Sequence, residues 1–490
     1  QILAANPARE RRNFNGSELN QARLSYFGRA KYDYDSKYIA EVSFRQDGSY
    51  IFPEGKQFGF FPSVSAGWVI SREDFFKIEP VSTLKLRASY GTTGYDGIDG
   101  LTTNIAPFQF QNNYNVVNSF TGAGNGGYVF ANSNLTGLAP QNVVPNPDIT
   151  WAINKTINVG IDMGFLNDAL TFSFDYFTTK RSKILVSRGA TIPGTFGTGL
   201  PQVNIGEQKA RGLEFTVSYA KSRGDFDYAV GFNMGYAIDE YVSWPQNTNI
   251  QDFQRVIGRP TTGVVTGYVS KGIIRDQATI DALPAGYTQF GAPVQLGYVL
   301  VEDIRGDNYT PGADGKVDAS DQTVISENAV PRMNFGAPID LRWKTISLNI
   351  FLQGVGPYDK FVRTLNHATG VFQLTDRPYF ELWTDAFDAE LNPDGKYPGA
   401  SGSFGGTSQT GTGSTFWMRN GAYVRLKNIN LAYSVPQRII GRIGLRGLQV
   451  NLNASNLFTI SAFKEHDPEQ LELDSYPMFK TYSFGLNFSL

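Results

Sequence analysis

The fold is decided by the stretch Phe226-Asp227-Tyr228-Ala229-Val230-Gly231-Phe232-Asn233-Met234-Gly235-Tyr236. Every even-numbered position is apolar or aromatic, and every odd-numbered position is Asp, Asn, Ala or Gly. Because side chains alternate across a β-strand, one face of this segment is apolar and the other is polar or small. A soluble sandwich strand would normally carry Lys or Glu on its polar face, whereas Gly231, Asn233 and Gly235 suit a crowded lumen. The stretch is typical of a membrane-spanning β-strand.

The same alternation recurs along the whole chain. It appears in residues 38–45, 83–90, 157–163, 170–176, 213–219, 346–352, 448–454 and 482–490. Charged residues fall on the polar face each time, as Glu41 and Arg45 do opposite Val42 and Phe44. A charge facing lipid at the bilayer midplane would cost about 2 to 4 kcal/mol, so this segregation predicts the wall of a transmembrane barrel.

Composition excludes several other classes of protein and of functional site. The formal net charge of the 490 residues is −2, which does not suit a nucleic-acid-binding protein. With no Cys and only two His, the chain has no disulfides, thiol nucleophile or multi-His metal centre. No apolar run approaches the roughly 18 residues of a membrane helix, so we expect strands to do any spanning. No carboxylate pair or phosphate-binding Gly loop stands out, and we therefore predict no enzymatic activity.

Connections of two lengths alternate along the chain. Short ones are expected at residues 35–37, 165–168, 221–225 and 342–344, and long ones at 94–147, 183–207, 239–332 and 356–420. In an outer-membrane barrel short turns face the periplasm and long loops face outward. We therefore predict an all-β, antiparallel, up-and-down transmembrane barrel that contributes about 13 strands of an expected total of about 22. A switch of apolar phase at Lys427 predicts a β-bulge.

Several stretches resemble one transporter family, and they follow its order along nearly the whole chain. They include Ser25-Tyr26-Phe27-Gly28-Arg29, Phe61-Pro62-Ser63-Val64-Ser65-Ala66-Gly67-Trp68, Leu84-Lys85-Leu86-Arg87-Ala88-Ser89-Tyr90-Gly91-Thr92-Thr93-Gly94, Asn146-Pro147-Asp148-Ile149-Thr150-Trp151, Gly421-Ala422-Tyr423-Val424-Arg425-Leu426-Lys427-Asn428, Ala454-Ser455-Asn456-Leu457-Phe458 and Asp467-Pro468-Glu469. Each piece alone is weak, but their order and spacing together are specific. On these residues the chain is similar to the SusC/RagA family of TonB-dependent outer-membrane transporters.

The resemblance implies that residues 1–490 are the C-terminal part of one barrel domain in the outer membrane of a Gram-negative bacterium. The chain begins at Gln1 without Met, so we expect a processed or partial chain whose plug and first strands lie in an N-terminal portion of the same transporter. Implied partners are that portion, the TonB complex that it contacts, outer-membrane lipid and a SusD-like surface lipoprotein that acts as a lid. A dimer of transporter–lid pairs is left open.

The function implied by the resemblance is import of oligosaccharides or oligopeptides. A passive porin or adhesin barrel is the first alternative, and a secreted β-rich carbohydrate-binding protein is the second. A plug and a TonB-contacting segment would separate the importer from the porin.

Two sets of side chains are candidates for contacts with cargo or plug. Aromatic residues of the long loops could stack on a sugar or peptide, or only pack the loops or meet the lid; they are Tyr287, Phe290, Tyr379, Phe380, Trp383 and Trp417. Charges on the polar face could touch the plug, or only be solvated in the lumen; they are Glu41, Arg45, Lys85, Arg87, Asp162 and Asp175.

An Asp-rich loop is the candidate metal site. Its acidic residues are Asp303, Asp307, Asp314, Asp318 and Asp321. The second half, from Asp314 and Gly315 onward, partly fits a calcium loop, which needs several oxygen ligands around a sharp Gly turn. The first half does not fit, because residues 308–313 intervene. The alternatives are a structural calcium ion and a solvated loop held by Asx turns, and transport is expected to require no cofactor.

Overall fold

The computed structural model describes residues 22–97, 109–112, 114–117, 129–130, 133–134, 137–140, 144–188, 199–362, 384–399, 413–441, 444–470, 476 and 478–489. Among these residues, no helix has the length and apolar character needed to cross a membrane.

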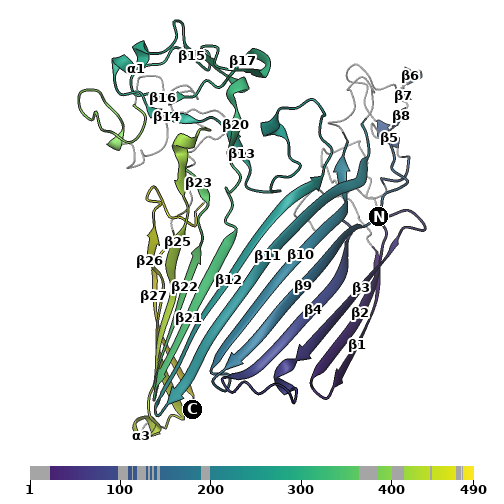
Figure 1. The fold of residues 1–490 in the computed structure, drawn as a ribbon, viewed down its shortest axis with the longest axis vertical. Coiled ribbons are helices and arrows are strands. Elements are labelled where there is room, and N and C mark those ends of the chain that lie inside the picture. The colour runs from purple at the N-terminus through teal and green to yellow at the C-terminus, as the bar shows by residue number, and fades with distance from the viewer. Residues whose placement is uncertain are drawn as a thin grey trace.

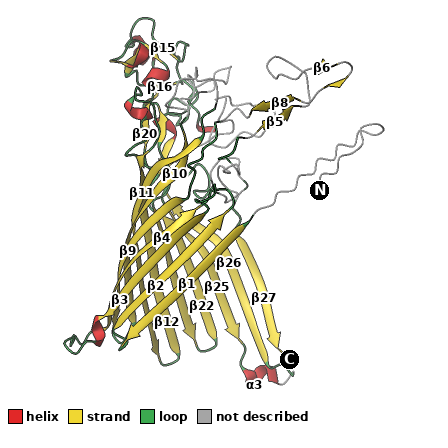
Figure 2. Cartoon of the chain, turned by 90° about the vertical axis from the view of Figure 1, so that its right-hand side faces the viewer, coloured by secondary structure: helices red, strands yellow, loops and turns green. Residues whose placement is uncertain are grey.

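Thirteen long strands form a single antiparallel sheet (Figure 1). They are β1 (Arg23–Tyr34), β2 (Tyr38–Ser49), β3 (Phe58–Val69), β4 (Val81–Tyr95), β9 (Ala152–Phe165), β10 (Leu170–Ser187), β11 (Gln202–Arg223), β12 (Phe226–Ser243), β21 (Met333–Trp343), β22 (Ile346–Val355), β25 (Tyr423–Ser434), β26 (Gly447–Ser461) and β27 (Thr481–Ser489). Each pairs with the next in this order, so the topology is the predicted up-and-down one. The sheet curves into part of a barrel wall (Figures 1 and 2).

The register of the sheet confirms the predicted facing of the strands. On β12, Val230 lies opposite Tyr219 on one side and Ile339 on the other. The neighbouring Asn233 lies opposite Thr216 and Gly336. Because directly opposed residues share a face, apolar side chains are aligned across strands on one side of the sheet and small or polar ones on the other.

The apolar face is a continuous surface. Phe215 of β11 has its ring centroid 5.0 Å from that of Phe172 and 6.2 Å from that of Phe232, and Phe232 lies 6.0 Å from Phe335. These four rings cross four adjacent strands. Large apolar side chains on this face are exposed in the isolated chain, which soluble proteins avoid over so wide an area. The face is built to meet lipid.

Short and long connections lie at opposite ends of the sheet (Figure 1). The short links 35–37, 166–169, 224–225 and 344–345 agree with prediction to within a few residues. One long loop is shorter than expected, because β10 and β11 continue past the membrane-length segment and leave only residues 188–201 between them. The helical turn α3 (Gln437–Ile440) lies at the short-link end.

The predicted β-bulge is present at Lys427. In the pairing of β22 with β25, Phe351 lies opposite Asn428 and Leu352 opposite Leu426, so Lys427 has no counterpart. The pairing of β25 with β26 is irregular at the same place. Because of this extra residue, the apolar side chains before and after Lys427 lie on the same face of the sheet.

The long connections carry small elements of their own, mostly at the top of Figure 1. The strands are β5 (Tyr114–Val117), β6 (Val129–Phe130), β7 (Ser133–Asn134), β8 (Gly137–Pro140), β13 (Val265–Gly267), β14 (Ser270–Ile273), β15 (Thr288–Gln289), β16 (Val299–Val301), β17 (Arg305–Gly306), β18 (Thr310–Pro311), β19 (Lys316–Val317), β20 (Thr323–Ser326), β23 (Asp359–Phe361) and β24 (Met418–Asn420). The helical turns are α1 (Gln277–Asp281), η4 (Asp252–Gln254), η5 (Asp307–Tyr309), η6 (Ala319–Asp321) and η8 (Thr415–Trp417), while η1 (Ile70–Arg72) lies at the short-link end. The buried apolar clusters are also concentrated in and beneath these connections.

Candidate functional site

A compact ionic cluster lies on the polar face of the sheet. Arg87 of β4 donates from Nε to Asp162 of β9 at 2.9 Å and from Nη1 and Nη2 to Asp175 of β10, both at 2.7 Å. The Ser173 hydroxyl donates to Asp162 at 2.8 Å. Gly160 separates Arg87 from Asp175 in the register, and a Cβ there would lie 2.5 Å from Asp175 Oδ1. The glycine therefore gives the guanidinium room to reach two strands away.

The other predicted polar-face charges also have nearby charged groups. Glu41 accepts a hydrogen bond of 2.6 Å from Arg29. Arg45 donates from Nε to Asp47 at 2.6 Å. The remaining candidate on this face, Lys85, lies directly opposite Asp162 on the neighbouring strand β9. The structure thus brings Arg87, Asp162 and Asp175 together. Glu41 and Arg45 form two separate ion pairs, with Arg29 and Asp47. The prediction that they contact a plug stays a prediction.

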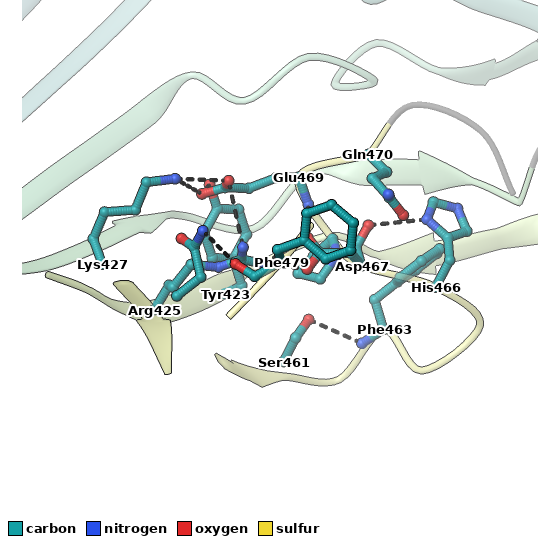
Figure 3. A network of polar contacts seen from close by, with 12 residues as sticks. Tyr423, Arg425, Lys427, Ser461, Phe463, His466, Asp467, Glu469, Gln470 and Phe479 are labelled. Atoms are coloured by element: carbon teal, nitrogen blue, oxygen red, sulfur yellow. Dashed lines mark hydrogen bonds and ion pairs between the residues drawn. The ribbon is translucent and has the colours of Figure 1, made fainter. Parts of the chain in front are cut away.

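A second network lies where β25 meets the connection between β26 and β27 (Figure 3). Arg425 is 1% exposed, and its Nη2 donates to both carboxylate oxygens of Asp467, at 2.5 and 2.6 Å. Its Nη1 lies 3.6 Å from Glu469 Oε2. Breaking a buried charge pair by removing one partner is costly, so this contact fixes the connection against the wall.

Glu469 collects further donors from the same strand. Lys427 Nζ lies 2.9 Å from Glu469 Oε2, and the Tyr423 hydroxyl donates to Oε1 at 2.9 Å (Figure 3). Lys427 is the residue that the bulge inserts into β25. The bulge therefore presents this lysine to the carboxylate.

Lys360 of β23 also holds this connection, through backbone carbonyl groups. Lys360 Nζ donates to the carbonyl oxygen of Pro468 at 2.7 Å and also to that of Gln470, and it lies 4.9 Å from the centroid of the Phe463 ring. Burial lowers the pKa of Lys360 to about 8. A neutral amine still has two hydrogens for the two carbonyl groups.

The imidazole of His466 is the neighbouring titratable group. Its Nδ1 lies 2.9 Å from the carbonyl oxygen of Asp467, while Nε2 is buried with no hydrogen-bond partner among the described residues. Burial, with the nearby Lys360 charge, lowers the pKa of His466. The geometry favours a neutral ring with its proton on Nδ1.

Two of the candidate aromatic residues pack the long connection 244–332. The Tyr287 hydroxyl donates to the carbonyl oxygen of Val301 at 3.1 Å, and burial raises the pKa of Tyr287 to about 12. The Phe290 ring meets the ring of Tyr268 edge to face at 4.9 Å. Both side chains are partly buried and pack against the apolar clusters of this connection, which matches the alternative that they pack the loops.

A third candidate, Trp417, is buried. It stacks on Tyr397 with ring centroids 6.1 Å apart and packs with Val362 and Phe463. The remaining candidates, Tyr379, Phe380 and Trp383, lie outside the described residues. Contact of any of the six with cargo stays a prediction.

The carboxylates of the Asp-rich loop bind backbone N–H groups of the loop itself. Asp321 Oδ1 accepts from the amides of Ile304 and Arg305 at 2.8 and 2.9 Å, and its Oδ2 accepts from the amide of Asp318 at 2.8 Å. Asp303 accepts from the amide of Gly315 at 2.7 Å. Burial raises the pKa of Asp303.

Asp314 and Asp318 follow the same pattern, whereas Asp307 lies near a lysine. Asp314 accepts from the amide of Lys316 at 2.9 Å, Asp318 from that of Ser320 at 2.7 Å, and Asp307 lies 3.9 Å from Lys316 Nζ. In the part of the chain that the structure describes, no three acidic or histidine side chains are grouped closely enough to hold a metal ion. The arrangement favours the alternative of a self-bonded loop. Calcium binding stays a prediction.

Sequence reasoning missed the role of Arg425 and Lys360. A signal exists for Arg425, because residues 421–428 and 467–469 both resemble stretches of the transporter family and are separated in sequence by the hairpin of β25 and β26. No signal existed for Lys360, which lies in a long connection without a periodic pattern.

Comparison with known proteins points the same way as the geometry. The model of the family described as "TonB dependent receptor-like, beta-barrel" matches residues 2–457. The chain is 27% identical to TonB-dependent receptor P3 of Formosa agariphila, covering 96% of this chain and 46% of that protein. It is 25% identical to TonB-dependent receptor SusC of Bacteroides thetaiotaomicron, covering 95% of this chain and 43% of that protein. The chain thus spans about half the length of the curated relatives it matches.

Solved structures share the fold. A structure of the RagAB peptide transporter is similar with a TM-score of 0.70 and 19% identity, over 97% of this chain and 49% of that one. A structure of the RagAB peptide importer in the "open-open" state gives a TM-score of 0.70 at 20% identity, over 98% of this chain and 49% of that one.

Proposed function

The chain belongs to the family of TonB dependent receptor-like β-barrels, and on that premise we propose that it forms the C-terminal part of the barrel of an importer energised through TonB. Proteins of this family lie in the outer membrane, and they are transporters, not enzymes. In this setting the apolar face of the sheet meets lipid, the polar face lines the lumen, and the short links face the periplasm.

The observation that carries the proposal is the thirteen-stranded wall with its faces sorted by polarity. Within the described residues β1 and β27 each pair on one side only. Free strand edges require partners in lipid, because unpaired backbone groups cannot be satisfied there. We propose that the N-terminal portion of the same transporter supplies those strands and the plug.

The cargo proposed is an oligosaccharide or an oligopeptide, taken up with a SusD-like lipoprotein as lid. Support for a peptide cargo comes from structural neighbours described as a peptide transporter and a peptide importer. The saccharide alternative and the lid rest on the resemblance to the SusC/RagA family. The large connection 244–332 lies at the external mouth, where a lid would be expected to dock (Figure 1).

Uptake measured in whole cells tests energised transport. Cells lacking the complete gene should lose uptake of the cargo, and cells with the gene but an inactive TonB complex should lose it equally. A passive porin would keep uptake without TonB, and a secreted carbohydrate-binding protein would be found outside the membrane fraction. Separate growth arms on glycans and on peptides distinguish the two cargo classes. Affinity purification of the complete transporter tests the lid, which should appear as a co-purifying lipoprotein.

The site predictions are tested on the same complete protein. Titrating the protein with calcium chloride should show whether the Asp-rich loop binds calcium. If it does, the Asp303→Asn variant should bind calcium more weakly. Cargo binding by the Tyr287→Ala and Trp417→Ala variants, each checked for folding, tests the aromatic residues.

A further inference from the structure

The connection between β3 and β4 is longer than most of the described periplasmic links and carries two exposed apolar side chains. It runs Ile70-Ser71-Arg72-Glu73-Asp74-Phe75-Phe76-Lys77-Ile78-Glu79-Pro80, begins with η1, and is referred to below as the 70–80 turn. Figure 2 shows it projecting sideways beyond the lower rim of the sheet. Phe75 and Ile78 in it are 68% and 55% exposed. A hydrophilic turn would hold the hairpin equally well, so these apolar side chains need a separate explanation.

An unbroken run of aromatic rings joins this turn to the lipid-facing wall. Tyr34 and Tyr38 have centroids 6.4 Å apart, Tyr38 and Trp68 stack at 6.5 Å with an angle of 10°, and Trp68 lies 6.4 Å from Phe75. The first three rings belong to β1, β2 and β3, at their periplasmic ends. Aromatic side chains at that level form the girdle of a membrane barrel. Phe75 therefore continues the membrane-facing surface beyond the strands.

A carboxylate holds the turn in this position. The Tyr38 hydroxyl and the Trp68 Nε1 both donate to Glu73 Oε1, at 2.5 and 2.9 Å. Lys37 Nζ lies 3.5 Å from Glu73 Oε2. These hydrogen bonds, the one from Tyr38 foremost, lower the pKa of Glu73, so that it is ionised at neutral pH.

A further contact ties the turn to its neighbour. Arg72 Nη1 donates to the carbonyl oxygen of Ser36 at 2.8 Å, which links the 70–80 turn to the turn between β1 and β2. The projection is thus attached at two points and has a defined direction.

The charges of the turn indicate what kind of contact it makes. Arg72 and Lys77 are outnumbered by Glu73, Asp74 and Glu79. A patch of this composition has no net attraction for an anionic surface, so apolar contact must dominate. Lys77 stands between Phe76 and Ile78, where its alkyl stem can lie along apolar groups while the ammonium reaches phosphates.

We propose that the 70–80 turn is a membrane anchor, with Phe75 and Ile78 inserted in the periplasmic phospholipid leaflet beside the aromatic girdle and Glu73 as the residue that positions them. The anchor would resist rotation and vertical displacement of the barrel while the energised portion pulls on the plug. It goes beyond the transport function and does not depend on which cargo is carried.

Spin labelling tests the proposal. The chain has no cysteine, so Phe75→Cys and Ile78→Cys each create one labelling site within it. The complete transporter, with any cysteines elsewhere replaced, is labelled with a nitroxide and reconstituted in phosphatidylcholine vesicles. Collision rates with oxygen, which concentrates in lipid, and with a water-soluble nickel chelate are then measured.

Two reference positions calibrate the result. Leu486→Cys lies on the lipid face of β27, and Leu391→Cys lies in an external connection where the side chain is 88% exposed. We expect labels at 75 and 78 to favour oxygen over nickel by several-fold, as at 486. Nickel access equal to that at 391 would place the turn in water and overturn the proposal. Protection from both reagents would also overturn it, because the turn would then be covered by protein.

A second variant tests whether Glu73 positions the turn. Glu73→Gln removes the carboxylate charge but keeps a similar shape. The spectrum of the label at 78 should then show faster motion, while the label at 486 is unchanged. Identical spectra at 78 would refute the positioning role of Glu73. Replacing phosphatidylcholine by phosphatidylglycerol should not deepen the label, and a marked deepening would contradict the apolar nature of the contact.

Discussion

Arg425 on the inner side of β25 donates through one nitrogen to both carboxylate oxygens of Asp467, at 2.5 and 2.6 Å. The two residues are 42 positions apart, and their contact joins the wall to the external connection between β26 and β27. We predict that Asp467→Ala lowers the stability of the complete protein by about 3 kcal/mol, near the low end for a broken buried pair because Glu469 remains nearby. Thermal unfolding in detergent measures the loss, and proteolysis should locate it in the connection.

An exposed ion pair provides the control for that experiment. Lys396 and Asp385 lie 2.9 Å apart in another external connection, with exposed side chains. Lys396→Met should change the unfolding temperature little, because solvent screens such pairs. Equal effects of Asp467→Ala and Lys396→Met would show that burial of Arg425 does not matter.

The facing of β12 predicts opposite outcomes for two positions three residues apart. Lysine at position 230 would face lipid, at a cost that reaches about 2 to 4 kcal/mol at mid-depth, whereas lysine at position 233 would face the lumen. Val230→Lys should therefore reduce the folded barrel in the outer-membrane fraction, and Asn233→Lys should not. Heat-modified mobility on gels reports the folded fraction. Similar tolerance at the two positions would contradict the assigned facing.

The wall was predictable from sequence because its physics is local. Alternation with period two fixes which side chains share a face, and the phase switch at Lys427 marked the bulge because only one extra residue restores the facing. Connections are different. The contact of Arg425 with Asp467 depends on how a non-periodic loop folds back. The partial burial of Tyr287 and Phe290 and the burial of Trp417 depend on packing within such loops. Periodicity carries no information about packing of this kind.

Two inward-facing glycines predict different responses to alanine. At Gly160 a Cβ would lie 2.5 Å from Asp175 Oδ1 and 2.8 Å from Arg87 Cζ, whereas at Gly235 nothing lies within 4 Å. Gly160→Ala should displace the guanidinium from its carboxylates and cost about 1 to 3 kcal/mol, as overpacking does. Gly235→Ala should be neutral or slightly stabilising. Unfolding temperatures of the two variants test this, and a destabilised Gly235→Ala with an unaffected Gly160→Ala would reverse the expectation.

Acidification should release the external connection that carries His466. The pKa of His466 in the folded protein lies below its unfolded value near 6.5, because of burial and the Lys360 charge. A lowered folded pKa means that the unfolded chain binds more protons, so the stabilisation is complete above pH 6.5 and is lost as the pH falls through the folded pKa. Protonation would place a second N–H on Nε2, which has no acceptor among the described residues. The protection factors of residues 462–470, which allow for the slower intrinsic exchange in acid, should therefore fall as the pH is lowered from 6.5. His466→Gln should flatten that dependence. An equally steep response in the variant would assign the effect to groups other than the His466 imidazole.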